Sequence, residues 1–276
     1  MAPPAALGIP RNHLLSSLSM ADFGLLKPRL ETVELGLRKI LEDPNKPIKH
    51  VYFPLSGIVS VVTASTRKRQ IEVGIIGHEG MTGINVVLGN DRSPHSTYVQ
   101  SAGQGQRIKA ADLRQAMQKS ASLRDGLLHF VQAFMTQTAY TALANGQAKL
   151  TERLARWFLM AQDRLDGNEL ALTHDFLALM LCVHRPGVTK AVNLLESRGL
   201  VGAKRGIVIV RDRAGLKALA EGLCGIPEAE YRRLIGRRAK DQRQRETCCR
   251  RDDKPTLGVS RTKPIFPRAE KARDTH

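Results

Sequence analysis

The sequence has few cysteines and none of the cysteine spacings that hold metals. The four are Cys182, Cys224, Cys248 and Cys249, with no Cys-x-x-Cys pair and no zinc-type spacing. This pattern disfavours a zinc site, an iron–sulfur cluster and a disulfide framework. It favours free thiols in a reducing compartment.

The sequence also lacks a long apolar run. No N-terminal stretch is long enough for a signal peptide or a membrane span, so we expect a cytoplasmic protein without a membrane partner. Enzyme signatures are missing as well, because we find no nucleophile–base pair, no phosphate loop with its lysine and no metal-ligand set. We therefore expect a protein that is not an enzyme and that holds no cofactor.

Positive charge is what the chain has in excess. The formal net charge is +17 and the sequence pI is near 10.2. Residues 237–276 hold 13 Lys and Arg against 6 Asp and Glu, which places +7 in this tail and +10 in the rest. Such an excess favours a polyanionic partner, nucleic acid first and an anionic membrane surface second.

The stretch Leu172–Val210 carries the most specific pattern of the chain. Thr173 suits the N-cap of a first short helix, since its hydroxyl can accept a backbone N–H. Pro186 suits the first turn of a second helix, and Gly199 can end that helix. Two short strands joined by a basic turn follow. The pattern predicts a helix-turn-helix with a β-hairpin wing.

The second of these helices would present polar side chains to the major groove of DNA. Arg185 could form two hydrogen bonds to a guanine, and Lys190 lies further along, nearer a phosphate. The alternative is a winged helix that serves as a protein-interaction module, which a gel shift would distinguish. The residues expected at DNA are Thr173, Arg185, Gly187, Thr189, Lys190, Asn193, Lys204 and Arg205.

The first half of the chain is rich in short β-forming runs separated by glycine-containing turns. Such a series predicts a small antiparallel barrel or roll, here preceded by one or two helices between His13 and Leu30. A polar hairpin tip is expected at 66–69. The expected strands are Ile48–Phe53, Ile58–Thr63, Gln70–Ile76, Thr97–Ser101 and Gln106–Ile108.

A long helix is expected at Ser122–Lys149. Its apolar positions Leu127, Val131, Phe134 and Thr138 step by four, three and four residues, which is the spacing of a short coiled-coil seam. The seam predicts a homodimer interface. The alternative is a helix that packs only on its own roll.

Leu172–Ala214 resembles the C-terminal DNA-binding domain of the Crp/Fnr family of bacterial transcription regulators. Phe53–Ser60 and Gly77–Gly83 resemble that family's effector-binding β-roll, and the resemblance extends over residues 13–235. It implies an α+β fold with an N-terminal antiparallel β-roll, a long dimerisation helix and a C-terminal winged helix-turn-helix. It also implies a dimeric regulator that binds an inverted-repeat operator and contacts RNA polymerase.

The resemblance places an effector site in the glycine-rich part of the roll. In the family this region holds a cyclic nucleotide, with a glutamate on the ribose and an arginine on the phosphate. Ile84 and Ser96 stand at those two positions, which disfavours cyclic AMP. A roll without a ligand remains the alternative. The expected effector site consists of Gly80, Gly83, Ile84, Ser96 and Thr97.

The expected domains follow from these patterns. A disordered N-terminus covers 1–12, the roll 13–120, the dimerisation helix 121–150, the winged helix-turn-helix domain 151–235, and a disordered basic tail 236–276. Thr151 is expected to cap the helix under the helix-turn-helix. The tail either adds non-specific affinity for DNA or is solvated without a role.

A metal site is a weaker alternative for the roll. His78, Glu79 and His95 are suitable ligands, but they have no fixed spacing that would bring three of them together.

Overall fold

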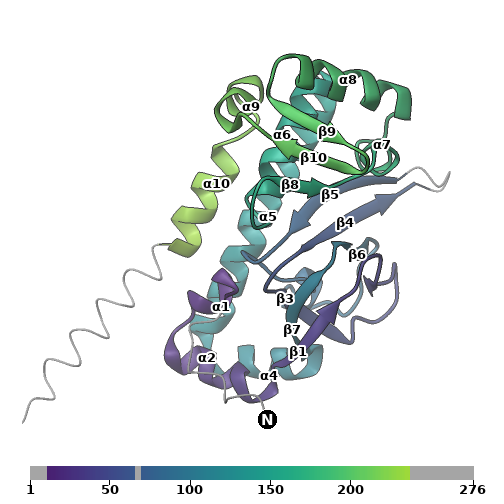
Figure 1. The fold of residues 1–276 in the computed structure, drawn as a ribbon. Helices are drawn as coiled ribbons and strands as arrows, with labels where there is room; N and C mark the ends of the chain where they lie inside the picture. The colour runs from purple at the N-terminus through teal and green to yellow at the C-terminus, as the bar shows by residue number, and fades with distance from the viewer. Residues whose placement is uncertain (1–10, 66–69, 237–276) are drawn as a thin grey trace, which may run out of the picture.

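The computed structural model describes residues 11–65 and 70–236, which form a β-roll, a long helix and a winged helical domain (Figure 1). The predictions for residues 1–10, for the hairpin tip at 66–69 and for the tail from residue 237 lie outside the described residues. Asn12 already belongs to the fold. Its side-chain amide donates to the carbonyl oxygens of Pro54 (2.9 Å) and Gly80 (2.8 Å).

The roll consists of two antiparallel sheets, in strand order β1-β7-β3 and β2-β6-β4-β5. Apolar side chains such as Phe53, Val59 and Ile76 fill the space between the sheets. The five predicted strands are present as β3 to β7, whereas β1 and β2 were not predicted. The strands are β1 Glu31–Leu35, β2 Ile40–Glu42, β3 His50–Pro54, β4 Ile58–Ala64, β5 Gln70–Ile76, β6 Ser96–Ser101 and β7 Gly103–Lys109.

Short helices close the ends of the roll. Asn12 and Ser19 cap the first two, each accepting a backbone N–H from the first turn. These helices are α1 His13–Ser16, α2 Met20–Leu26, a 3-10 turn at Lys27–Arg29, α3 Ile84–Val87 and α4 Ala110–Lys119.

The long helix α5 (Ala121–Gln147) joins the roll to the winged domain (Figure 1). Ser120 caps it by accepting the N–H of Leu123 (3.1 Å). Its 27 residues span about 40 Å at the usual rise per residue. Neither α5 nor any other helix of the described residues is long and apolar enough to cross a membrane.

The face of α5 expected to form a dimer seam is buried inside the chain itself. Leu127, Val131 and Phe134 are at most 9% exposed and belong to the core of the roll, and Thr138 is half-buried beside it. Side chains packed in their own core cannot also interdigitate with a second chain. Leu127, Val131 and Phe134 are therefore not available for a dimer seam, whereas the assignment of Thr138 stays a prediction.

The winged domain packs the helices α6 to α9 around a small sheet of strand order β8-β10-β9. The N–H of Lys149 donates to Glu152, which starts α6, so the predicted cap at Thr151 was wrong by two residues. The short strand β8 was not predicted. The elements are α6 Leu150–Gln162, β8 Glu169–Ala171, α7 His174–Met180, α8 Arg185–Ser197, β9 Val201–Lys204, β10 Ile207–Val210 and α9 Arg213–Leu219.

After α9 the chain turns back toward the roll. The helix α10 (Ile226–Tyr231) and a π-helical turn at Arg232–Gly236 run beside α5 (Figure 1). Leu234 and Ile235 are buried in the core of the roll, not in the core of the winged domain. The α+β fold class expected from the sequence is confirmed.

Candidate nucleic-acid interface

The winged domain carries α8 on its surface, at the top of the view in Figure 1. His184 is its N-cap residue, and Pro186 lies in the first turn, where a missing N–H costs nothing. One side of α8 is buried and the other faces solvent. The buried stripe agrees with the sequence pattern and consists of Val188, Ala191, Val192 and Leu195.

The solvent face of α8 is basic and polar. Arg185, Lys190 and Asn193 are exposed on it. Nε of Arg185 lies 3.3 Å from Oδ1 of Asp175 on α7, and the two side chains are 64% and 69% exposed. An ion pair as exposed as this one contributes about 0–1 kcal/mol to stability. Arg185 can therefore exchange Asp175 for another acceptor at little cost.

Two of the residues expected at DNA have partners inside the domain. Thr173 caps α7 by accepting the N–H of Phe176 (3.2 Å). The hydroxyl of Thr189 donates to the carbonyl oxygen of Arg185 (3.2 Å) and lies 3.0 Å from Nδ1 of His174. These contacts hold the first turn of α7 and join α7 to α8, so both threonines have a structural role in the helix-turn-helix.

Gly187 lies in the first turn of α8 and is half-buried. A methyl group built there would meet only a side-chain carbon of Leu150, at an ordinary 3.6 Å. The fold itself therefore does not require glycine at this position. Its small size leaves room for a close approach by a partner's backbone.

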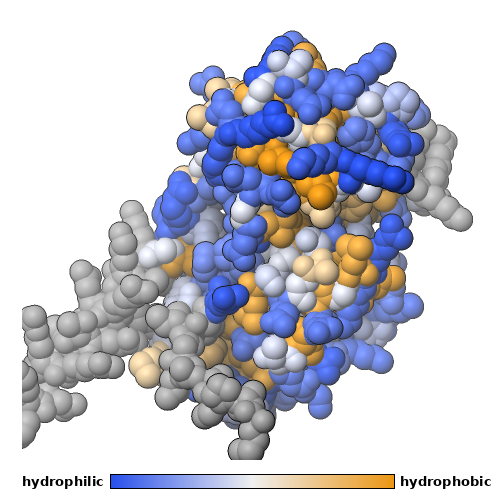
Figure 2. All heavy atoms as spheres, in the orientation of Figure 1, coloured by the Kyte–Doolittle hydropathy of each residue, from blue (hydrophilic) through white to orange (hydrophobic). Residues whose placement is uncertain are grey.

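The wing extends the basic surface. Lys204 and Arg205 are exposed at its tip, where Gly206 adopts a φ of 75° that closes the turn. Arg211 lies over β9, because a methyl group at Gly202 would be only 2.8 Å from its Nε. Sequence reasoning missed Arg211. In Figure 2 strongly hydrophilic side chains, in deep blue, lie across this half of the molecule.

A cavity of 470 Å³ lies between the roll and α5. Of the five residues expected at an effector, Gly83, Ile84 and Thr97 line it. Gly80 and Ser96 do not. A methyl group at Gly80 would lie 2.3 Å from ring carbons of Phe130, so this glycine packs against α5 instead.

Glu42 is a cavity residue that the sequence did not reveal. It is 6% exposed, and its Oε1 accepts the N–H of Gly83 at 2.6 Å. Burial raises the pKa of this carboxyl, while hydrogen bonds from Gly83, Thr82 and Thr97 act in the opposite direction. No lysine or arginine is among the cavity's lining residues.

The three residues considered as metal ligands are not brought together. His78 and Glu79 line one cavity and His95 lines another. Within residues 11–65 and 70–236 no group of three or more His, Cys, Asp or Glu is arranged to hold a metal ion.

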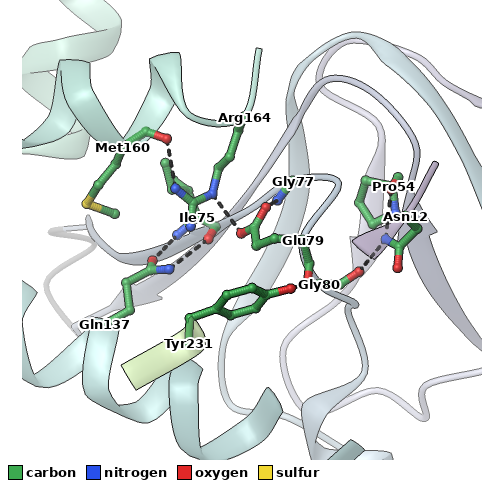
Figure 3. Close-up of polar contacts among 10 residues, drawn as sticks. All are labelled: Asn12, Pro54, Ile75, Gly77, Glu79, Gly80, Gln137, Met160, Arg164 and Tyr231. Atoms are coloured by element: carbon green, nitrogen blue, oxygen red, sulfur yellow. Dashed lines mark hydrogen bonds and ion pairs between the residues drawn. The ribbon is translucent and has the colours of Figure 1, made fainter. Parts of the chain in front are cut away.

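Glu79 instead joins the roll to the winged half of the molecule (Figure 3). Its carboxylate accepts from Nε of Arg164, just after α6, at 2.7 Å and from the N–H of Gly77 at 3.0 Å. Its backbone carbonyl accepts from the hydroxyl of Tyr231 on α10 at 2.7 Å. Gln137 on α5 exchanges two hydrogen bonds with the backbone of Ile75.

Comparison with known proteins agrees with this geometry. Residues 152–219 match the family described as the Crp-like helix-turn-helix domain. No curated protein sequence matches the chain.

Several solved structures share the fold. A transcriptional regulator of the Crp/Fnr family from Eubacterium rectale is 19% identical with a TM-score of 0.61, and the match covers 76% of this chain and 98% of that one. FixK2 from Bradyrhizobium japonicum is 16% identical with a TM-score of 0.61, covering 69% and 96%. The c-di-GMP-responsive regulator CLP of Xanthomonas campestris is 17% identical with a TM-score of 0.56, covering 69% and 98%. Residues 152–219 thus form a Crp-like helix-turn-helix domain, and the chain has the fold of the Crp/Fnr transcriptional regulators.

Proposed function

We propose that this protein is a dimeric transcription regulator of the Crp/Fnr type that binds a specific DNA sequence and senses an effector in its roll. The observation that carries the proposal is the solvent face of α8 together with the wing. Arg185, Lys190 and Asn193 on the helix and Lys204 and Arg205 on the wing present cations and an amide on one exposed domain. An exposed helix of this kind fits the major groove.

We assign the two basic side chains of α8, Arg185 and Lys190, to different contacts with DNA. Arg185 lies at the helix N-terminus, which points into the groove, and its planar fork matches the two acceptors of guanine. Lys190 lies more than one turn later, nearer the groove wall, and we assign it to a phosphate. Lys204 and Arg205 would neutralise further phosphates.

The dimer interface that we propose is the exposed face of α5. Met135 is 65% exposed and Leu143 is 38% exposed, which is unusual for apolar side chains in the middle of a long helix. The positions along this face step alternately by four and three residues, as a coiled-coil seam requires. They are Leu128, which is half-buried against the roll, and the exposed residues Gln132, Met135, Ala139, Ala142 and Gly146.

A dimer would bind an inverted repeat, because two-fold symmetric proteins bind two-fold symmetric sites. We further propose that the protein acts in the cytoplasm and contacts RNA polymerase from the DNA. A ligand in the roll would change the packing of α5 and so the placement of the two α8 helices.

The rival proposal is a sensor whose winged domain binds another protein. The four exposed cations and one exposed amide on α8 and the wing favour DNA, since a protein-binding surface would be richer in exposed aromatic residues. We do not propose an enzymatic activity.

Selection of bound sequences from a random DNA pool tests the proposal. An inverted repeat with half-site centres about 10 base pairs apart, or a multiple of that, is expected. Binding of the selected site and a scrambled site is then measured across a salt series. Arg185→Ala should weaken the selected site by ~1–3 kcal/mol and relax one base of each half-site.

Lys190→Ala is the matched comparison on the same helix. It should weaken both sites alike and lower the salt slope by about one unit per helix. Equal loss on both sites for Arg185→Ala would make Arg185 a backbone contact. Unchanged affinity for both variants would support the protein-interaction rival.

A further inference from the structure

We infer that the cavity between the roll and α5 binds a small, mainly apolar molecule that has one hydrogen-bonding end and no negative charge. This inference rests on the proposed function and deepens it, since it names the chemical class of the effector. Four features of the described residues support it, namely volume, walls, polar groups and the lack of cations.

The volume suits a small organic ligand. Cavities that bury such ligands usually measure about 300–1,000 Å³, and this one measures 470 Å³. Its mouth lies beside Met135 and Leu88, which are 65% and 58% exposed. In a single chain the cavity is therefore accessible from solvent without unfolding of the roll.

The walls are mainly apolar and come from three parts of the fold. Strands of the roll supply one side, the turn around α3 supplies the second and α5 supplies the third. A ligand with an apolar body would bury its surface against all three, which is the main favourable contribution to binding at such sites. The apolar lining residues are Val61, Val73, Ile76, Ile84, Leu88, Phe134, Met135 and Ala139.

The polar lining residues are Glu42, Thr82, Asn85, Ser93, His95, Thr97 and Thr138, and two of them suit the ligand's hydrogen-bonding end. The carboxyl of Glu42 lines the cavity and is fixed in place by the N–H of Gly83. His95 lines the same cavity, and its Nδ1 is buried without a hydrogen-bond partner in the part of the chain described here. A buried nitrogen without a partner is costly. A hydroxyl or amine on the ligand would remove that cost.

The cavity is poorly suited to an anion. Its lining residues include no lysine or arginine, and its buried acidic group is Glu42. Burying a phosphate or carboxylate without a cation costs several kcal/mol, and the lining residues offer no cation to offset that cost. A cyclic nucleotide therefore does not fit the chemistry of the site, although the cavity would hold one by size.

An occupant would also touch the helix that joins the two halves of the molecule. Met135 and Ala139 line the cavity and belong to the exposed face of α5 that we propose as the dimer interface. A ligand against them would bear on the packing of two copies of α5. Ligand binding in this cavity can thus change the placement of the DNA-binding domains through one helix.

The test uses the full-length protein and two fluorescent probes of similar shape. N-phenylnaphthylamine is uncharged, is largely apolar and carries one N–H donor. Anilinonaphthalene sulfonate adds a negative charge to nearly the same body. The uncharged probe should bind one per chain, at least about tenfold (about 1.4 kcal/mol) more tightly than the sulfonate. Millimolar cyclic AMP should not displace it.

A matched pair of variants locates the bound probe. Thr138→Trp fills the cavity, whereas Thr136→Trp makes the same change on the same helix at a position that does not line it. Thr138→Trp should weaken the uncharged probe at least about tenfold, and Thr136→Trp should leave it unchanged. If Thr138→Trp does not fold, Leu88→Trp at the exposed mouth replaces it.

Each result bears on the inference. Binding to Thr138→Trp or Leu88→Trp that equals wild type would overturn it, as would absence of binding, equal affinity of the sulfonate or displacement by cyclic AMP. DNA binding is measured separately on the same samples. A protein that takes the probe but selects no DNA would refute the proposed function while leaving the assignment of the cavity's chemistry intact.

Discussion

Replacement of Glu72 by glutamine tests the contact between the roll and the winged domain. Glu72 is buried on β5, and its Oε1 accepts from Nε1 of Trp157 on α6 at 2.6 Å. Its Oε2 and the amide oxygen of Gln100 both face the single hydroxyl hydrogen of Ser60. A proton on Glu72, donated to Ser60, would satisfy all of these groups at once.

Burial raises the pKa of Glu72 from 4.5 to about 7, although Ser60, Trp157 and Arg164 oppose the shift. Between these two values the unfolded chain loses the proton while the folded chain keeps it. The free energy of unfolding therefore falls as pH rises, by about 1.4 kcal/mol per pH unit and about 3 kcal/mol in all. Below the pKa that Glu72 has in the unfolded chain this loss of stability is absent. Above the pKa that it has in the folded chain the loss is complete.

Glutamine stays neutral at every pH and keeps the shape of the protonated acid. Urea unfolding of wild type and Glu72→Gln from about pH 5 to about pH 8 should therefore show curves that diverge as pH rises, with the variant the more stable at the upper end. Glu34→Gln, at an exposed position on β1, is the control and should run parallel to wild type. Parallel curves for Glu72→Gln would mean that Glu72 is ionised in the folded protein and that the reasoning is wrong.

Two further predictions concern the proposed dimer and its DNA contact. Met135→Asp should turn the dimer into a folded monomer by light scattering, since an unpaired buried charge costs about 3–5 kcal/mol; Met20→Asp, at a 72% exposed methionine on α2, should remain dimeric. A dimer that survives Met135→Asp would place the interface elsewhere. Asp175→Asn should raise the affinity for the selected DNA by up to about fivefold, because the exposed pair that it breaks is worth at most ~1 kcal/mol and Arg185 becomes available. In an Arg185→Ala background the gain should shrink, and an equal gain in both backgrounds would rule out competition between Asp175 and DNA for Arg185.

The parts of the fold that could be predicted are those with strong local patterns. Residues 58–63 are almost all β-branched, and the strand β4 lies at Ile58–Ala64. Strands β1 and β8 were missed for the opposite reason. Glu31–Leu35 carries two glutamates, and Glu169–Ala171 is only three residues long, so their pairing partners decide their conformation.

The proposed dimer face shows which question sequence periodicity cannot decide. Helix α5 has apolar residues on two sides, and both sides step by three and four residues. Leu127, Val131 and Phe134 are buried by the roll, while Met135 remains exposed. Only the position of the roll, which depends on contacts distant in sequence, distinguishes the two sides.

The residues that line the cavity could be predicted only in part, again because some of their contacts are distant in sequence. Gly83 and Ile84 come from a segment with a recognisable glycine-rich pattern, and Thr97 begins a strand that was predicted. Glu42 lies 41 residues before Gly83, to which it is hydrogen-bonded. A glutamate at the end of a three-residue strand suggests a solvated side chain, and no local signal indicates that it is buried.

The path of the chain after α9 changes what kind of unit the winged domain is. Its first helix continues from α5, and its last residues end at Leu234 and Ile235 inside the roll's own core. In topological terms the winged domain is an insertion between two segments of one hydrophobic core, and it is connected to that core at both ends. The winged domain therefore cannot rotate about a single hinge. Any reorientation of α8 must bend the chain at two places or pull α10 away from Glu79.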